Sequence, residues 1–371
     1  MKETTKKKII AIGIVLLLLI SSVAIYVALG GLEIFKPSKP SIHEEPPEEK
    51  MLDPISIKVM EMMGQVDESM ISGYIEKITS FGPHPTAHRL LYKLSNRPII
   101  GRFFDLPIEK VANYLYNEFE SMGLEVRYHH WAQNPTIKNL RVPSWFFGWA
   151  VGDNVVATLP GADKSSDEIY LLVAHYDTMN RLGSNDFSNK IVGANDDTSG
   201  VALLLSTAKV MSQYSFNHTV RFLAVSGEEQ WLMGSRAYAE EAAKNNDNIV
   251  AVINIDMIGN RGPGIRNTEV LVAGVNNSGW WIANYTINVN QRYPELLNFT
   301  IIQEDPFKEG SDHQSFLENG FDAIHIAEAT QDYDWHRKSD TLKNMDVSYT
   351  KEVARLVLAT VAQMAWDFNY S

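Results

Sequence analysis

The sequence predicts an α/β protein, a three-layer α/β/α fold around a central mixed, mostly parallel sheet. Two observations carry this prediction. Short, β-branched apolar runs recur along the chain, and helical stretches lie between or after them. The runs are continuous rather than alternating, which is typical of strands that are buried on both faces.

The predicted elements begin with a helix over 108–122 that ends at Gly123, followed by a strand over 125–130. Beyond them, apolar runs predict buried strands and the segments between them predict helices. No proline-rich break or repeat interrupts residues 56–371, so we predict one domain there. The further strands cover 169–174, 220–225, 250–255, 270–273 and 323–326, and the further helices cover 201–214, 235–244 and 350–368.

The N-terminus predicts a membrane anchor. Residues 1–8 carry four lysines and form the expected cytoplasmic N-terminus, and residues 9–30 are uncharged and almost wholly apolar. A spanning helix needs about 20 apolar residues, whereas the apolar core of a secretory signal has about 7 to 15, so the length favours an uncleaved signal-anchor over a cleaved signal peptide. The positive-inside rule then predicts a single-pass cell-membrane protein with its folded domain outside the cytoplasm. Residues 31–55 are rich in Pro and Glu and predict an extended linker.

Composition limits the chemistry available to the chain. It has 371 residues, ten histidines, a net charge of −12 and no cysteine. Without cysteine there is no disulfide, thiol nucleophile or iron–sulfur cluster, so any metal must be held by His and carboxylates. The acidic balance argues against nucleic acid as a partner, because phosphate contacts need clustered Lys and Arg. No motif indicates an obligate protein partner.

Acidic and histidine residues follow the predicted strands where each strand ends. Taken alone, each pattern has a structural explanation, such as a helix N-cap or a solvated turn. Their succession favours one site, because ligands in open α/β sheets collect outside the carboxyl ends of the strands. The residues concerned are His175, Asp177, Glu228, Glu229, Asp256 and His336, together with Asp196 before the helix over 201–214.

Carboxylates grouped in this way repel one another unless a cation lies between them. The mixture of His, Asp and Glu makes Zn²⁺ the leading candidate, with Co²⁺ or Mn²⁺ also compatible. The number of ligands suggests two ions, and ions about 3.5 to 4 Å apart are a recognised hydrolytic arrangement.

A set of motifs, in this order, resembles the M28 family of co-catalytic zinc aminopeptidases. The resemblance covers residues 106–368. It implies the α/β/α fold of that family and a cis peptide between Asp196 and Asp197. The motifs are His-x-Asp, Gly-Ala-Asn-Asp-Asp-x-Ser-Gly, Gly-Glu-Glu, Asn-Ile-Asp-Met-Ile-Gly, Ser-Asp-His-x-Ser-Phe and His-x-x-x-Asp-Thr.

The resemblance also implies a ligand set for two zinc ions. His175 and Asp256 would hold one ion, Glu229 and His336 the other, and Asp196 would bridge them. His313 in the Ser-Asp-His motif is an alternative last ligand, but the family's last ligand matches His336. On that assignment His313, Asp312 and His325 become residues beside the metals or in the pocket.

The implied activity is hydrolysis of the N-terminal peptide bond of peptides with a free N-terminus. Two zinc ions would lower the pKa of a shared water from 15.7 towards about 7, giving a bridging hydroxide at neutral pH. Glu228 matches the general base that accepts the proton and returns it to the leaving amine. Asp177 matches the carboxylate that orients His175 and raises its basicity.

Alternative functions share parts of this pattern. Glutaminyl-peptide cyclotransferases resemble the C-terminal stretch, with His325 ten residues before Trp335 and with Trp231 shortly after Glu229, and they use a single zinc. Asp197 counts against them, because cyclases tend to carry Ser there. A carboxypeptidase or dipeptidase of the same family and a metal-free binding ectodomain are further alternatives.

Aromatic and apolar residues beside the motifs could line a substrate pocket, although core packing explains them equally well. A polar insertion over 179–192 could form a loop above the site. The side chains concerned are Trp231, Trp335, Phe307, Phe316 and Met257.

Overall fold

The computed structural model describes residues 53–86, 106–133, 136–137, 140–141, 150–179, 191–261, 268–273, 278–304, 310–329, 332 and 334–366. The predicted anchor over 9–30 and nearly all of the predicted linker lie outside these residues. Within the described ranges, no helix has the length and apolar character needed to cross a membrane. Leu52–Ser371 form one compact unit, and its first helix begins at Pro54, two residues before the predicted start of the domain.

An eight-stranded sheet forms the middle layer of this unit, in the order β1-β4-β6-β5-β7-β10-β8-β9. β5 runs parallel to β6 and β7, β10 runs parallel to β7, and β8 runs parallel to β9. β4 is antiparallel to β1 and β6, and β10 is antiparallel to β8, so the predicted mixed sheet is confirmed. The strands are β1 (Glu125–Gln133), β4 (Ala150–Leu159), β5 (Ile169–His175), β6 (Thr219–Val225), β7 (Ile249–Ile255), β8 (Thr268–Ala273), β9 (Phe299–Glu304) and β10 (Ala323–Glu328).

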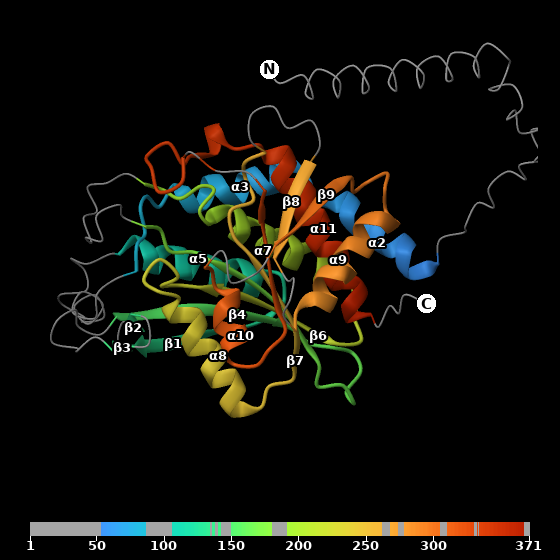
Figure 1. The fold of residues 1–371 in the computed structure, drawn as a ribbon, viewed down its shortest axis with the longest axis horizontal. Coiled ribbons are helices and arrows are strands. Elements are labelled where there is room, and N and C mark those ends of the chain that lie inside the picture. The colour runs from blue at the N-terminus through green and yellow to red at the C-terminus, as the bar shows by residue number, and fades with distance from the viewer. Residues whose placement is uncertain are drawn as a thin grey trace, which may run out of the picture. The chain divides into compact units, whose positions relative to one another are not determined.

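Helices cover both faces of the sheet, as the predicted three-layer fold requires (Figure 1). α5 (Pro107–Ser121), α7 (Thr198–Met211) and α11 (Val347–Ala365) pack on one face. α8 (Met233–Asn245) and α10 (His313–Glu318) pack on the other. The remaining elements are α2 (Pro54–Gln65) and α3 (Glu68–Thr79), which pack on α7 and α11, α9 (Trp280–Arg292), which packs on α11, the short strands β2 (Thr136–Ile137) and β3 (Leu140–Arg141), and the 3₁₀ turn η2 (Leu342–Asn344).

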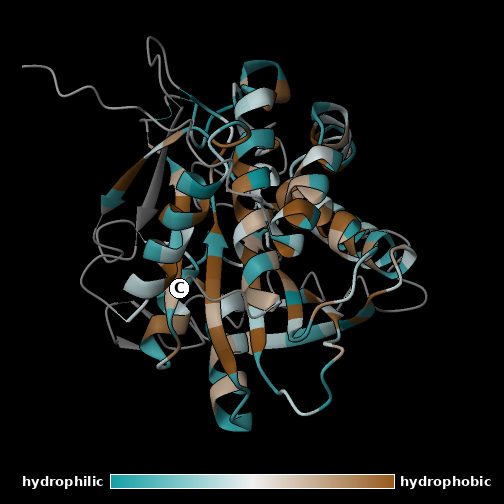
Figure 2. Ribbon diagram, turned by 90° about the vertical axis from the view of Figure 1, so that its right-hand side faces the viewer, coloured by the Kyte–Doolittle hydropathy of each residue, from teal (hydrophilic) through white to brown (hydrophobic). Residues whose placement is uncertain are grey.

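The core divides between the two faces because alternate residues of a strand point in opposite directions. In β5, whose seven residues are all buried, Leu172 and Ala174 join the cluster beneath α7 and α11, and Leu171 and Val173 join the cluster beneath α8 and α10. Figure 2 shows helices that carry both hydrophobic and hydrophilic residues, as expected for helices with one face buried against the core. Burying each large apolar side chain contributes about 1.5–3 kcal/mol, so this double core fixes the strands whose ends carry the motif residues.

Candidate metal centre

The motif residues meet at the carboxyl ends of the central strands. His175 is the last residue of β5, and Asp256 directly follows the neighbouring strand β7. Glu228 follows β6 after Gly227, whose φ of +79° and close contact with the Trp131 ring leave no room for a side chain. The turn at Gly227 therefore brings the acidic pair that follows it back over the end of the sheet.

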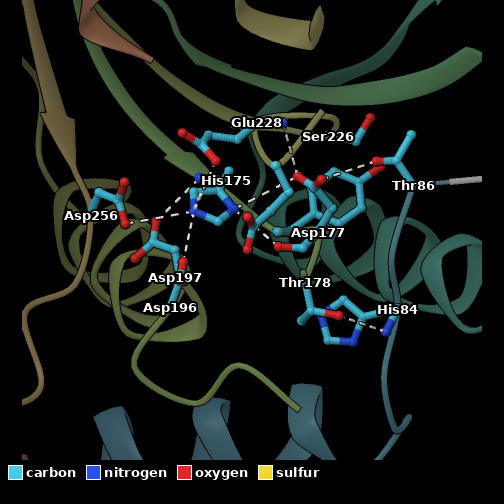
Figure 3. A network of polar contacts seen from close by, with 12 residues as sticks. His84, Thr86, His175, Asp177, Thr178, Asp196, Asp197, Ser226, Glu228 and Asp256 are labelled. Atoms are coloured by element: carbon cyan, nitrogen blue, oxygen red, sulfur yellow. Dashed lines mark hydrogen bonds and ion pairs between the residues drawn. The ribbon is translucent and has the colours of Figure 1, made fainter. Parts of the chain in front are cut away.

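The first half of the site is built around the His175 imidazole, which is 1% exposed (Figure 3). Its Nε2 lies 3.1 Å from Asp196 Oδ1 and 3.6 Å from Asp256 Oδ1. Burial alone would lower the pKa of His175, but Asp256 and its neighbouring carboxylates raise that pKa well above the usual value. Without a cation, a proton on this imidazole would balance part of the negative charge.

The second half of the site is built around His336, in the turn that follows β10. Its Nε2 lies 3.0 Å from Asp196 Oδ2 and 3.2 Å from Glu229 Oε2. Asp196 therefore directs one carboxylate oxygen towards each of the two histidines. Burial would lower the pKa of His336, but its hydrogen bonds to Asp196 and Glu229 raise that pKa to about 10.

Two groups of potential ligands emerge, each with its ligand atoms within 4.8 Å of one another: His175 with Asp197 and Asp256, and Asp196 with Glu229 and His336. Asp197 takes the place in the first group where the sequence predicts a shared Asp196. The Asp197 carboxylate also accepts hydrogen bonds from backbone N–H groups, those of His175 (3.2 Å), Gly200 (3.0 Å) and Met257 (3.2 Å). The Asp197 carboxylate therefore connects the end of β5, the start of α7 and the residue that follows Asp256. The peptide bond between Asp196 and Asp197 is cis, as the resemblance implies.

The side chains fit a pair of divalent cations. Glu229 Oε1 and Asp256 Oδ1 are buried and accept no hydrogen bond from the described part of the chain, although a buried carboxylate oxygen ordinarily has a partner. Burial, and next the charge of Asp196, raise the pKa of Glu229 to about 8. Imidazole nitrogen and carboxylate oxygen are the donor set that zinc accepts in the absence of thiolates.

Glu228 lies beside both groups and belongs to neither. Its Oε2 is 4.0 Å from His175 Nε2, farther than the oxygens of Asp196 and Asp256. Burial and nearby carboxylates, among them Asp312, raise the pKa of Glu228 well above its usual value. Because it lies beside the candidate ligands and belongs to neither group, the Glu228 carboxyl is a candidate proton acceptor.

Asp177 is fully buried behind His175 and connects three segments (Figure 3). His175 Nδ1 lies 3.0 Å from the backbone carbonyl of Asp177 and 3.7 Å from its Oδ1. The Asp177 carboxylate accepts hydrogen bonds from Glu228 N (3.2 Å) and Thr86 Oγ1 (3.1 Å). The tautomer of His175 is thus set mainly by the carbonyl, whereas the carboxylate positions Glu228. Thr86 is not among the site residues predicted from the sequence.

One further carboxylate and a chain of polar side chains hold the candidate ligands in place. Asp340 accepts hydrogen bonds from Asn195 N (2.7 Å) and Asp196 N (3.2 Å) and so fixes the backbone at Asp196. Ser311 Oγ donates to Asp256 Oδ2 at 2.7 Å and lies 2.9 Å from Asn254 Nδ2. Because a carboxylate only accepts, the Ser311 hydroxyl must accept from the Asn254 amide.

The same Asn254 amide nitrogen lies 3.1 Å from His325 Nδ1. Because the amide N–H donates, His325 Nδ1 accepts the hydrogen bond, and a neutral His325 carries its proton on Nε2. His313 is buried and stacks on His325 with ring centroids 5.0 Å apart, and it belongs to neither ligand group. Asp312 is also fully buried, and burial raises its pKa to about 7.

A cavity of about 750 Å³ opens beside the candidate ligands. Three of the predicted pocket residues, Trp231, Trp335 and Met257, line it, and Trp335 stacks on His336 with ring centroids 4.0 Å apart. Phe316 instead packs in the core beneath α8 and α10. Phe307 and most of the predicted loop over 179–192 lie outside the described residues.

Known proteins resemble this chain in sequence and in fold. A sequence profile of peptidase family M28 matches residues 154–361. A probable zinc metalloprotease of Pyrenophora tritici-repentis is 29% identical over an alignment 251 residues long, which covers 57% of this chain and 56% of that protein. The chain therefore spans little more than half of that relative's length.

Solved structures with the same fold include an aminopeptidase from Aneurinibacillus sp. strain AM-1, with a TM-score of 0.62 and 18% identity, covering 83% of this chain and 96% of that one. A glutaminyl cyclase from Fimbriiglobus ruber has a TM-score of 0.61 and 18% identity, covering 80% of this chain and 95% of that one. At this level of identity the two likenesses show the fold and leave the reaction open.

Proposed function

The chain belongs to peptidase family M28, and from that premise we propose that it is a di-zinc aminopeptidase that removes the first residue of peptides with a free N-terminus. The observation that supports the proposal is the position of Asp196 between two histidines, with Oδ1 3.1 Å from His175 Nε2 and Oδ2 3.0 Å from His336 Nε2. A carboxylate in this position can bridge two cations.

Each metal ion would be coordinated by its own histidine and carboxylate. His175 and Asp256 would hold one ion, and Glu229 and His336 the other, with Asp196 shared between them. When bound, a zinc pair lowers the pKa of a shared water and polarises the scissile carbonyl group.

Glu228 is the proposed general base. Its carboxylate would accept the proton of the attacking water and return it to the leaving amine. The hydrogen bond from its backbone N–H to Asp177 Oδ1 fixes where the side chain begins. Because Glu228 is not needed as a ligand, one of its oxygens can face the water throughout the reaction.

Glutaminyl-peptide cyclisation is a second candidate. The group of Asp196, Glu229 and His336 could by itself hold a single zinc ion, and Trp231 and Trp335 provide an aromatic pocket beside it. The group around His175 favours hydrolysis instead, because a single-zinc enzyme has no use for a further set of ligands.

A peptide panel distinguishes the two reactions. The full-length protein is incubated with peptides that have free or acetylated N-termini, one of them beginning with Gln. The proposal predicts release of the first residue from unblocked peptides only. Cyclisation of the Gln peptide without cleavage would overturn it, and release of C-terminal residues would indicate a carboxypeptidase.

We also propose that residues 9–30 anchor the domain on the outer face of the cell membrane, since lysine-rich residues precede an apolar stretch of spanning length. Resistance of the membrane-bound protein to carbonate extraction, together with digestion of the domain by protease added to intact cells, would support this topology. Recovery of the protein in the soluble fraction would contradict it.

A further inference from the structure

The cavity beside the candidate ligands combines apolar walls with one carboxylate that the proposed reaction does not use. Its apolar lining includes Met257 and the indole rings of Trp231 and Trp335, which are 58% and 52% exposed. Of the carboxylates in the described lining, Glu328 alone belongs to neither ligand group and is not the proposed base. Glu328 therefore needs an explanation of its own.

The fold holds Glu328 in a fixed position next to the metal ligands. Glu328 is the last residue of β10, and its backbone N–H donates to the carbonyl of Met257 at 2.8 Å. Both carboxylate oxygens lie 3.1 Å from Asn195 Nδ2, and Oε2 also accepts from the backbone N–H of Asn260. Asn195 directly precedes Asp196, so the Glu328 carboxylate is tied to the candidate bridging ligand and is only 7% exposed.

The side chains around Glu328 carry negative charge. Asp332 Oδ2 lies 2.9 Å from the same Asn195 amide nitrogen, and Asp340 accepts from the Asn195 backbone. Within the described ranges, no Lys, Arg or His forms an ion pair with Glu328. Burial, followed by the charge of Asp332, raises the pKa of Glu328 to about 9. A carboxylate buried without a counter-charge is costly, and a cation that enters from solvent would offset that cost.

We infer that Glu328 selects peptides whose first residue has a cationic side chain, lysine or arginine, an inference that rests on the proposed aminopeptidase function. Lysine and arginine have a long apolar stem and a charged head. The apolar wall of the cavity accommodates the stem, and the Glu328 carboxylate pairs with the head group. The indole faces of Trp231 and Trp335 add attraction for a cation.

Kinetics on matched peptides test this selection. The full-length enzyme is assayed on two peptides that differ only in their first residue, lysine or norleucine, because norleucine keeps the apolar stem of lysine and lacks the ammonium group. We expect kcat/KM for the lysine peptide to exceed that for the norleucine peptide by about tenfold or more, as a charge-assisted hydrogen bond in a partly buried site provides.

The decisive variant is Glu328→Gln, which keeps the size of the side chain and one acceptor for the Asn260 N–H. It should lower kcat/KM for the lysine peptide about 10- to 100-fold and leave the norleucine peptide within about twofold. Retained activity on norleucine shows that the variant folds and binds metal. Glu318→Gln, at the exposed end of α10, makes the same chemical change outside the cavity and should alter neither value.

Equal kcat/KM values for both peptides with the unchanged enzyme would overturn the inference. An equal loss of kcat/KM on both peptides in Glu328→Gln would also overturn it, because Glu328 would then bind the α-amine of the substrate or stabilise the fold. A calorimetric titration with lysine amide and norleucine amide measures the same selection without turnover. Tighter binding of lysine amide, lost in Glu328→Gln, supports the inference even if no peptide is cleaved, and equal binding refutes it. Absence of cleavage from every peptide would refute the proposed function alone.

Discussion

Replacement of Glu228 by Gln separates proton transfer from metal binding. The Glu228 carboxylate lies 4.0 Å from His175 Nε2, whereas the nearest oxygens of Asp196 and Asp256 lie at 3.1 and 3.6 Å. Glu228 belongs to neither ligand group, so the loss of its charge should leave the bound metal unchanged. The hydrogen bond to Asp177 comes from the Glu228 backbone and survives the substitution.

The expected size of the effect follows from the role of the residue. A positioned general base accelerates a reaction about 10²- to 10⁴-fold, and an amide cannot accept the proton of the water at neutral pH. At about 1.36 kcal/mol for each tenfold change, the variant should lose about 2.7–5.4 kcal/mol of transition-state stabilisation. The loss should appear in kcat, because the substrate is still bound by the same cavity.

Steady-state kinetics and metal analysis of the same preparation provide the assay. The matched control is Glu229→Gln, since Glu229 Oε2 lies 3.2 Å from His336 Nε2 and its Oε1 is a buried oxygen without a described partner. Glu229→Gln should lose metal, and Glu228→Gln should keep it. Activity of Glu228→Gln close to that of the unchanged enzyme, or loss of its metal, would refute the assignment of the base.

Further predictions concern the proposed bridging ligand Asp196, the buried carboxylate of Asp177, the metal-free protein and the hydrophobic core. Asp196→Asn should lose metal and activity together, and metal analysis that finds the full complement would contradict the bridging role. Asp177→Asn should lower activity about 10- to 100-fold in kinetic assays, because the Asp177 carboxylate positions Glu228 and lies 3.7 Å from His175 Nδ1. In protein stripped of metal by a chelator, activity should vanish and the melting temperature should fall as the pH rises. The pKa of Glu229 is raised to about 8 from 4.5, and the pKa of His336 is raised to about 10 from 6.5. Between these values the folded protein holds protons that the unfolded chain has released, so the folded state loses stability as the pH rises. A melting temperature that rises over this range would disprove this prediction. Leu172→Ala, in the middle of β5, should cost about 2–5 kcal/mol of unfolding free energy in urea, and a loss under 1 kcal/mol would contradict its place in the core.

The sequence predicts the parts of the fold that follow from continuous apolar runs. β5, β6, β7 and β10 lie where their runs indicate, because strands buried on both faces contain few polar residues. β4 is not predicted, because Gly152, Asp153 and Asn154 interrupt its pattern. The structure explains the interruption, since the Asn154 side chain is buried and binds Ser226 N (3.1 Å) and the carbonyl of Gly234 (2.9 Å).

Helix α9 is a second element that is not predicted from the sequence. Its residues include Trp280, several Asn and β-branched residues, which favour helices only weakly. Packing against α11 and β10 stabilises it instead, and such tertiary contacts cannot be derived from local propensity.

Some residues of the site can be predicted from local sequence patterns, and others are defined only by contacts between distant parts of the chain. The motif residues lie together because each directly follows a strand or precedes a helix, which a sequence pattern can indicate. Thr86 could not be found in this way, because its partner Asp177 lies 91 residues farther along the chain. The triple backbone contact of Asp197 and the pairing of Asn195 with Glu328 likewise depend on the folded arrangement.

One chain is proposed to hold two metal ions between His175 and His336. Titration of zinc into the chelated full-length protein, followed calorimetrically and checked by metal analysis after desalting, measures the number of ions directly. We expect two zinc ions per chain, with hydrolytic activity complete at the second equivalent. Saturation at one zinc ion per chain, with full activity at that point, would contradict it.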